Sequence, residues 1–173
     1  MNENALLIAL RLVHILSGVF WVGTAVLIAW FLIPSQKSTG LAGMTFIYEL
    51  MIRRKLRASL FIAMFLTILS GLTMYVYLVV GSDGRWAQTT TAKVLGFGAL
   101  CAIVGGGWAG SVSAVTGGKL AALGKTIQDS GQPPNEAQMA QMNVFQDQIQ
   151  RVTQIAAVLL IIAVAAMASA RYL

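Results

Sequence analysis

Residues 6–34 read LLIALRLVHILSGVFWVGTAVLIAWFLIP, and this stretch decides the fold. From Leu12 to Pro34 it carries no charge unless His14 is protonated. About 20 consecutive apolar residues are enough to cross the hydrocarbon core of a membrane. No basic segment precedes the stretch and no small-residue cleavage site follows it, so we expect a retained transmembrane helix rather than a signal peptide.

The composition of the whole chain agrees with this reading. Of the 173 residues, 57% are hydrophobic and 10% are charged, whereas soluble domains carry about 25% charged residues. Four apolar spans are expected at about 5–33, 59–80, 93–115 and 152–170, and each must be helical because lipid offers the backbone no hydrogen-bond partner. The sequence therefore predicts a single all-α integral membrane domain over residues 1–173, a four-transmembrane antiparallel helix bundle.

The basic residues predict the orientation of the bundle. The first connection, 35–59, carries five of them and the third, 117–151, carries three, whereas Arg85 is alone in the second. By the positive-inside rule, connections one and three face the cytoplasm and both termini lie outside it, in a multi-pass protein of the plasma (inner) membrane. The net charge of +6 thus sits at membrane boundaries, where it favours lipid phosphate over nucleic acid as the partner.

Both cytoplasmic connections are predicted to contain helix. In connection one, apolar residues recur at helical spacing from Met44 after a break at residues 40–43, which indicates a helix leading into the second span. In connection three, Gly131-Gln132-Pro133-Pro134 is a stop, and Asn135 has the position of an N-cap before a second helix. We expect a cytoplasmic helical hairpin between spans three and four.

The candidate site lies in the outer half of the bundle. His14, the only histidine, lies about nine residues into the first span, or roughly 14 Å along the helix. Arg11 is one turn nearer the outer surface on the same helix face. Tyr75, Lys93 and Arg171 belong to the outer ends of the other spans. An ionisable group at membrane depth costs free energy and points to function.

This half of the bundle has several cations and few acids, which calls for an anion such as a lipid phosphate, a substrate carboxylate or a porphyrin propionate. A neutral imidazole is a common axial ligand of haem iron. We therefore expect haem b between the spans, with His14 as the metal ligand, Arg11 or Lys93 near the propionates, and Gly18 leaving space for a flat ring. Tyr75 completes the candidate cofactor-binding set.

Alternatives remain open at this point. One histidine supplies one iron ligand, so a second would come from Lys93, a methionine or His14 of another copy in a homodimer. Arg11 and Lys93 can also extend to lipid headgroups, and His14 can form a hydrogen bond between helices. Met139 and Met142 offer soft copper ligands, although their spacing is also that of packing residues.

Short motifs resemble a known group of membrane proteins. LVHILSGVFWVG at residues 12–23 resembles the first helix of HemJ-type protoporphyrinogen oxidases and of CopD-like copper-resistance proteins. MIRRKL at 51–56, Ser70-Gly71, and Trp86 with Lys93 resemble further segments of the HemJ type, and the ending from Met167 resembles small four-helix relatives of that group. The resemblance implies a four-helix bundle able to bind haem b, with His14 and Lys93 as the family's His and Lys.

Three functions follow as hypotheses. The first is a haem-b membrane protein active in redox or tetrapyrrole chemistry. The second is a non-catalytic accessory subunit that docks on a larger membrane complex. The third is copper handling of the CopD-like kind. No motif identifies a substrate or an electron partner.

Overall fold

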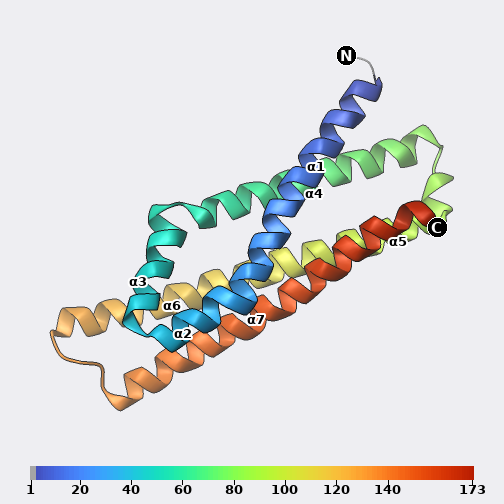
Figure 1. Cartoon of the computed structure of the whole chain (residues 1–173). Coiled ribbons are helices and arrows are strands. Elements are labelled where there is room, and N and C mark those ends of the chain that lie inside the picture. The colour runs from blue at the N-terminus through green and yellow to red at the C-terminus, as the bar shows by residue number, and fades with distance from the viewer. Residues whose placement is uncertain (1–2) are drawn as a thin grey trace.

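A computed structural model describes residues 3–173, apart from the side chains of residues 3 and 41. It is 92% helical, and the described residues form no strand. Four helical segments are long and apolar enough to cross a membrane: Asn4–Thr39, Leu56–Gly81, Thr90–Ser130 and Glu136–Tyr172. Successive segments run in opposite directions in one elongated bundle (Figure 1), which confirms the predicted fold class.

The first segment is longer than the predicted span. It comprises α1 (Glu3–Leu27), a π-helical turn η1 (Ile28–Leu32) and α2 (Ile33–Thr39). A proline inside a helix lacks one N–H, and its ring crowds the carbonyl four residues earlier. The wide turn η1 ends two residues before Pro34 and contains Trp30, whose carbonyl lies four residues before the proline ring. The segment ends at Gly40, whose φ of +58° suits a residue without a Cβ.

The helix predicted in connection one is present. It consists of α3 (Leu41–Tyr48) and a second π-helical turn, η2 (Glu49–Arg53). It does not run smoothly into the second span, because the chain turns sharply at Lys55, whose φ is +58°. The second span, α4 (Leu56–Gly81), begins directly after that turn.

The third and fourth segments also extend past the predicted spans. After a short turn η3 (Trp86–Gln88), the Thr89 side chain caps α5 (Thr90–Ile103), which continues through η4 (Val104–Trp108) into α6 (Ala109–Ser130). Gly131–Asn135 links α6 to α7 (Glu136–Ser169), which ends in η5 (Ala170–Tyr172). Asn135 is the N-cap, as predicted, and forms a capping box with Gln138. The cytoplasmic position of this connection stays a prediction.

The helices pack in two unequal groups. α1 lies along α4, while α7 lies along α5 and α6, and contacts of α1 and η1 with α7 join the groups. α4 has few contacts with α5. Both described chain ends and the α4–α5 connection lie at one end of the bundle, here called the termini end (Figure 1).

Small residues allow these helices to approach closely. The buried core contains Trp21, Leu160 and several alanines, among them Ala63, Ala102 and Ala163. A Cβ added to Gly98 would lie 3.1 Å from the carbonyl oxygen of Ala163, and one added to Gly105 would lie 3.3 Å from that of Ala156. Glycines of α5 and η4 therefore serve helix packing, as their density in the sequence predicts.

The outer surface of the bundle is apolar. Leu16 is 68% exposed and Val80 is 70% exposed, and most of the large exposed side chains of the four segments are hydrophobic. Lipid chains, rather than water, suit such a surface. The side chains thus agree with a multi-pass membrane protein.

Candidate functional site

His14 is held in a defined orientation by the second span. Its ring is half-buried between α1 and α4, and its Nδ1 lies 2.8 Å from the carbonyl oxygen of Thr67. A carbonyl oxygen only accepts hydrogen bonds, so Nδ1 carries the proton and donates it. In the neutral ring the lone pair is then on Nε2. The described residues form no hydrogen bond with Nε2.

Gly71 makes room for the imidazole. A Cβ at position 71 would lie 2.6 Å from Cε1 and 2.9 Å from Nδ1 of His14. No side chain other than hydrogen therefore fits at this position with the ring in place. Ser70, the neighbour of Gly71, has its Oγ 3.5 Å from Nδ1 and donates to the carbonyl of Leu66 at 2.5 Å.

Two hydroxyl groups continue this polar contact toward the middle of the bundle. The Oγ atom of Ser17 lies 2.8 Å from Oγ1 of Thr67, which donates to the carbonyl of Ala63 at 2.7 Å. The Ser17 hydroxyl also lies 2.5 Å from the carbonyl oxygen of Val13, so either hydroxyl can donate in the contact between Ser17 and Thr67, while the Thr67 carbonyl accepts from His14. Hydrogen bonds between helices in a membrane stabilise a bundle by about 0.6 kcal/mol each on average.

Gly18 does not border an open space for a flat ring, which is what the sequence suggests. A Cβ at this position would lie 3.5 Å from Cγ2 of Thr67, which is ordinary van der Waals contact. The space beside Gly18 is filled by the threonine side chain, so Gly18 acts as a packing residue between α1 and α4. His14, Gly18 and Trp21 share the α1 face that packs on other helices.

Tyr75 connects α4 to α5 at the termini end. It lies one helical turn from Gly71, its hydroxyl donates to the carbonyl of Ala92 at 3.4 Å, and its ring meets that of Trp86 edge-on at 5.1 Å. Tyr75 is thus in contact with the segment before Lys93, and its role in cofactor binding stays a prediction. This contact joins α4 to α5 at the termini end, and further along the bundle Ala63 shares a core cluster with Cys101 and Ala102.

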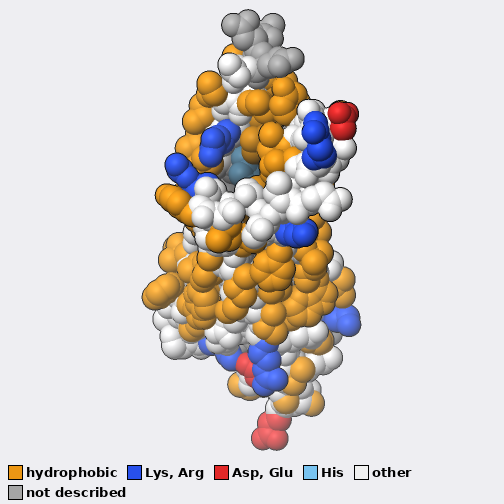
Figure 2. Space-filling view, turned by 90° about the vertical axis from the view of Figure 1, so that its right-hand side faces the viewer, with side chains coloured by type: hydrophobic (Ala, Val, Ile, Leu, Met, Phe, Trp, Pro, Cys, Tyr) orange, Lys and Arg blue, Asp and Glu red, His pale blue; other side chains and the backbone are white. Residues whose placement is uncertain are grey.

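The cations of the termini end are exposed and not neutralised. The side chains of Arg11 and Lys93 form no ion pair or hydrogen bond with any residue described between 3 and 173. Arg171 lies over the ring of Tyr172, with Cζ 5.1 Å from the ring centre. Figure 2 looks onto this end, and the side chain of the single histidine is visible at the bottom of a recess flanked by basic side chains.

Sequence reasoning identified His14 but missed its supporting residues. The Thr67 carbonyl is a backbone group and has no sequence signature, and Ser70-Gly71 suggests close helix packing without indicating that the imidazole is its partner. The usable signal was the cluster of small polar residues at 67, 70 and 71 in an otherwise apolar span. Among residues 3–173, no group of three or more His, Cys, Asp or Glu side chains lies together to hold a metal ion.

Comparison of the chain with protein-family models, with curated proteins and with solved structures gives no match. The resemblance of residues 12–23 to HemJ-type and CopD-like helices is therefore carried by the motifs alone.

Proposed function

We propose that this protein binds haem b in its membrane-embedded termini end, with Nε2 of His14 as an axial ligand of the iron. The hydrogen bond from Nδ1 to the Thr67 carbonyl carries this proposal. A histidine that ligates a metal through one ring nitrogen usually donates its other N–H to a carbonyl or carboxylate, which fixes the tautomer and raises the basicity of the ligand. His14 has that arrangement.

The charges beside His14 support an anionic cofactor. Arg11 is one turn from His14 on the same helix, and Tyr75 and Lys93 lie at the α4–α5 contact toward the same end. Unpaired cations at this depth favour binding of an anionic molecule, such as a haem with its two propionates, over binding of a neutral one. The cofactor would supply redox chemistry when bound, while the chain supplies the ligand, its orientation and the counter-charges.

A single imidazole suits haem better than a copper ion. Haem iron already has four equatorial nitrogen ligands and needs only one or two from the protein. A protein-bound copper ion needs several side-chain ligands, and the part of the chain that the structure describes has no cluster of His, Cys, Asp or Glu for it. Haem binding is therefore the function that this geometry favours.

The visible absorption spectrum of the detergent-purified protein tests the proposal. We expect a Soret band in the wild type and its loss in His14→Gln, which keeps an N–H donor for the Thr67 carbonyl but has no iron ligand. Arg11→Gln should weaken haem affinity by up to about fivefold, and less at high salt. A colourless wild type that takes up no added haem would contradict the proposal, and co-purification of that protein with a larger complex would favour an accessory subunit.

A further inference from the structure

We propose that a pocket at the turn between η2 and α4 binds an anionic phospholipid, with Arg57 on the headgroup phosphate. The pocket has a volume of about 330 Å³ and is lined by Met51, Ile52, Arg57, Ala58 and Phe61. Its size is at the lower end of the range for ligand clefts, roughly 300–1,000 Å³. Four of the five lining residues are apolar, and the fifth is a cation.

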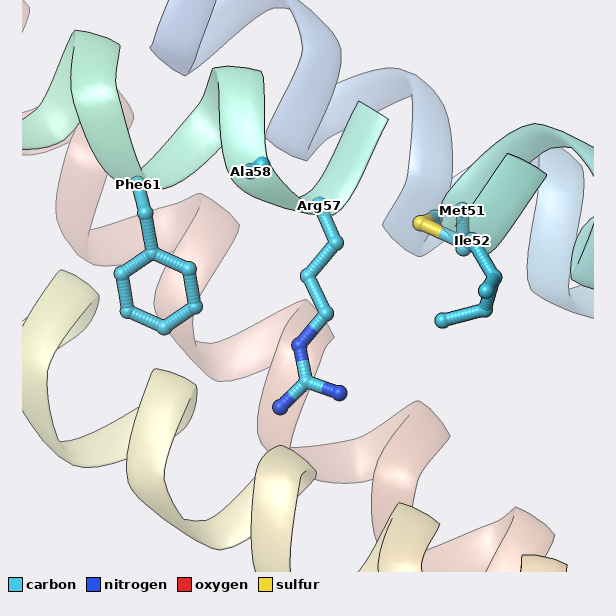
Figure 3. Close-up of a pocket in the computed structure, with 5 residues that line it drawn as sticks. All are labelled: Met51, Ile52, Arg57, Ala58 and Phe61. Carbon is cyan, nitrogen blue, oxygen red and sulfur yellow. The ribbon is translucent and has the colours of Figure 1, made fainter. Parts of the chain in front are cut away.

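The sharp turn at Lys55 creates this shape. With φ at +58°, Lys55 redirects the chain so that η2 and the first turns of α4 face a common space. Figure 3 shows Met51 and Ile52 on one side of that space, with Arg57 and Phe61 extending from α4 on the other. Phe61 is one turn from Arg57, so an aromatic ring lies beside the aliphatic part of the arginine on the same helix face.

The charge distribution selects an anion. Glu49 is the acid nearest in sequence, and its carboxylate is shared by Arg53 at 3.5 Å and Arg54 at 3.4 Å. Within residues 3–173, the Arg57 side chain has no carboxylate partner and forms no hydrogen bond. It is thus the unneutralised cation of the pocket, and a guanidinium binds phosphate through two parallel N–H···O bonds.

The position of the pocket selects a lipid over a soluble phosphate. Arg57 stands in the first turn of α4, where the apolar span begins, so its guanidinium lies at headgroup level while Phe61 lies one turn deeper. An acyl chain can occupy the apolar side of the pocket while the phosphate contacts Arg57. On the orientation predicted from the basic residues, this is the cytoplasmic leaflet, which is rich in anionic lipids.

Lipid binding to the delipidated full-length protein in detergent tests the proposal, measured by native mass spectrometry with phosphatidylglycerol and phosphatidylcholine of identical acyl chains. We expect phosphatidylglycerol to bind at least about fivefold more tightly, since one basic residue near an anionic headgroup contributes about that factor. Arg57→Gln should abolish this preference without changing the affinity for phosphatidylcholine. Phe61→Ala should weaken the binding of both lipids equally.

Arg53→Gln is the matched control, because it removes the same charge four residues earlier, in η2, from a side chain that is already paired with Glu49. It should change the preference by less than about twofold. If both arginine variants lose the preference for phosphatidylglycerol to the same extent, the preference is a general electrostatic effect and the site is overturned. Equal binding of the two lipids by the wild type, or thermal stabilisation by inorganic phosphate as large as that by phosphatidylglycerol, would overturn it as well. All of these variants are on exposed positions and none touches His14.

Discussion

At the scale of single residues, the contact between His14 and Gly71 determines whether the imidazole is oriented. The ring reaches the Thr67 carbonyl only because position 71 has no side chain. The sequence singles out His14, since a lone ionisable group in an apolar span is conspicuous. It does not reveal the acceptor, because every residue of α4 has a carbonyl and only the packing of α1 on α4 selects the one at Thr67.

Gly71→Ala is therefore expected to displace His14. The added Cβ would lie 2.6 Å from Cε1, so either the ring or the helix must move. Inserting a methyl group into a packed site costs about 1–3 kcal/mol of unfolding free energy. Thermal unfolding in detergent should show a lower midpoint, and haem affinity should fall.

Gly23→Ala is the control for this substitution. A Cβ at position 23, on the same helix as His14, meets nothing within 4 Å. Replacing a mid-helix glycine by alanine is favourable by roughly 0.5–1 kcal/mol where space allows. Equal destabilisation by the two substitutions would show that the contact between His14 and Gly71 has no special role.

At the scale of helices, capping and stop residues in the sequence predict where a helix begins or ends. They do not predict the π-helical turns inside it. Asn135 and the Gly131–Pro134 stop placed the start of α7 correctly, because capping is a contact within a few residues. The π-helical turns η1 and η4 were not predicted. η1 precedes Pro34, and η4 contains the glycines that contact α7 and Trp21, so both depend on tertiary packing as well as on sequence.

Two adjacent glycines of η4 give a sharp test of that packing. A Cβ at Gly106 would lie 2.4 Å from Cζ2 of Trp21 and 3.1 Å from Sδ of Met64, whereas one at Gly107 meets nothing within 4 Å. Gly106→Ala should therefore lower the unfolding free energy by about 1–3 kcal/mol. Gly107→Ala should leave it unchanged or raise it slightly, and the reverse order would contradict the placement of Trp21.

An ion pair joins α2 to α7 near the opposite end of the bundle. The Lys37 ammonium donates to the Asp147 carboxylate and also lies 3.4 Å from Oε1 of Gln150. The hydrogen bond from Lys37, followed by its charge, lowers the pKa of Asp147 below its ordinary value. A lowered pKa in the folded state means that this group stabilises the fold above its unfolded pKa, about 3.9, and loses that effect as the pH falls through the folded value.

A double-mutant cycle with Lys37→Met and Asp147→Asn should accordingly give a favourable coupling at pH 7. The coupling should shrink below about pH 4 and weaken with added salt, since both groups are partly exposed. A coupling that is the same at pH 3 and pH 7 would show that the two side chains do not act as an ion pair.

At the scale of the whole molecule, the number and direction of the spans follow from hydropathy, but the grouping of the helices does not. Apolar side chains cover most faces of each span, so periodicity gives little information on which face meets protein and which meets lipid. The pairing of α1 with α4, and of α7 with α5 and α6, depends on small residues whose partners lie far away in sequence.

The orientation across the membrane is a separate prediction. In a Cys101→Ala background, Ser82→Cys in the α4–α5 connection should react with a membrane-impermeant maleimide added to intact cells. Gln132→Cys in the α6–α7 link should react only after the cells are permeabilised. Labelling in the opposite order would invert the topology predicted from the basic residues.

The most direct test of the haem proposal is chemical rescue at position 14. His14→Gly removes the imidazole and leaves a space between α1 and α4 that free imidazole can enter. If His14 ligates haem iron, this variant should lack the wild-type Soret band and regain it when imidazole is added with haem. If the variant shows the wild-type spectrum without imidazole, His14 is not an iron ligand. Iron ligation by His14 would also be contradicted if the variant keeps its helical circular dichroism but no concentration of imidazole restores the Soret band.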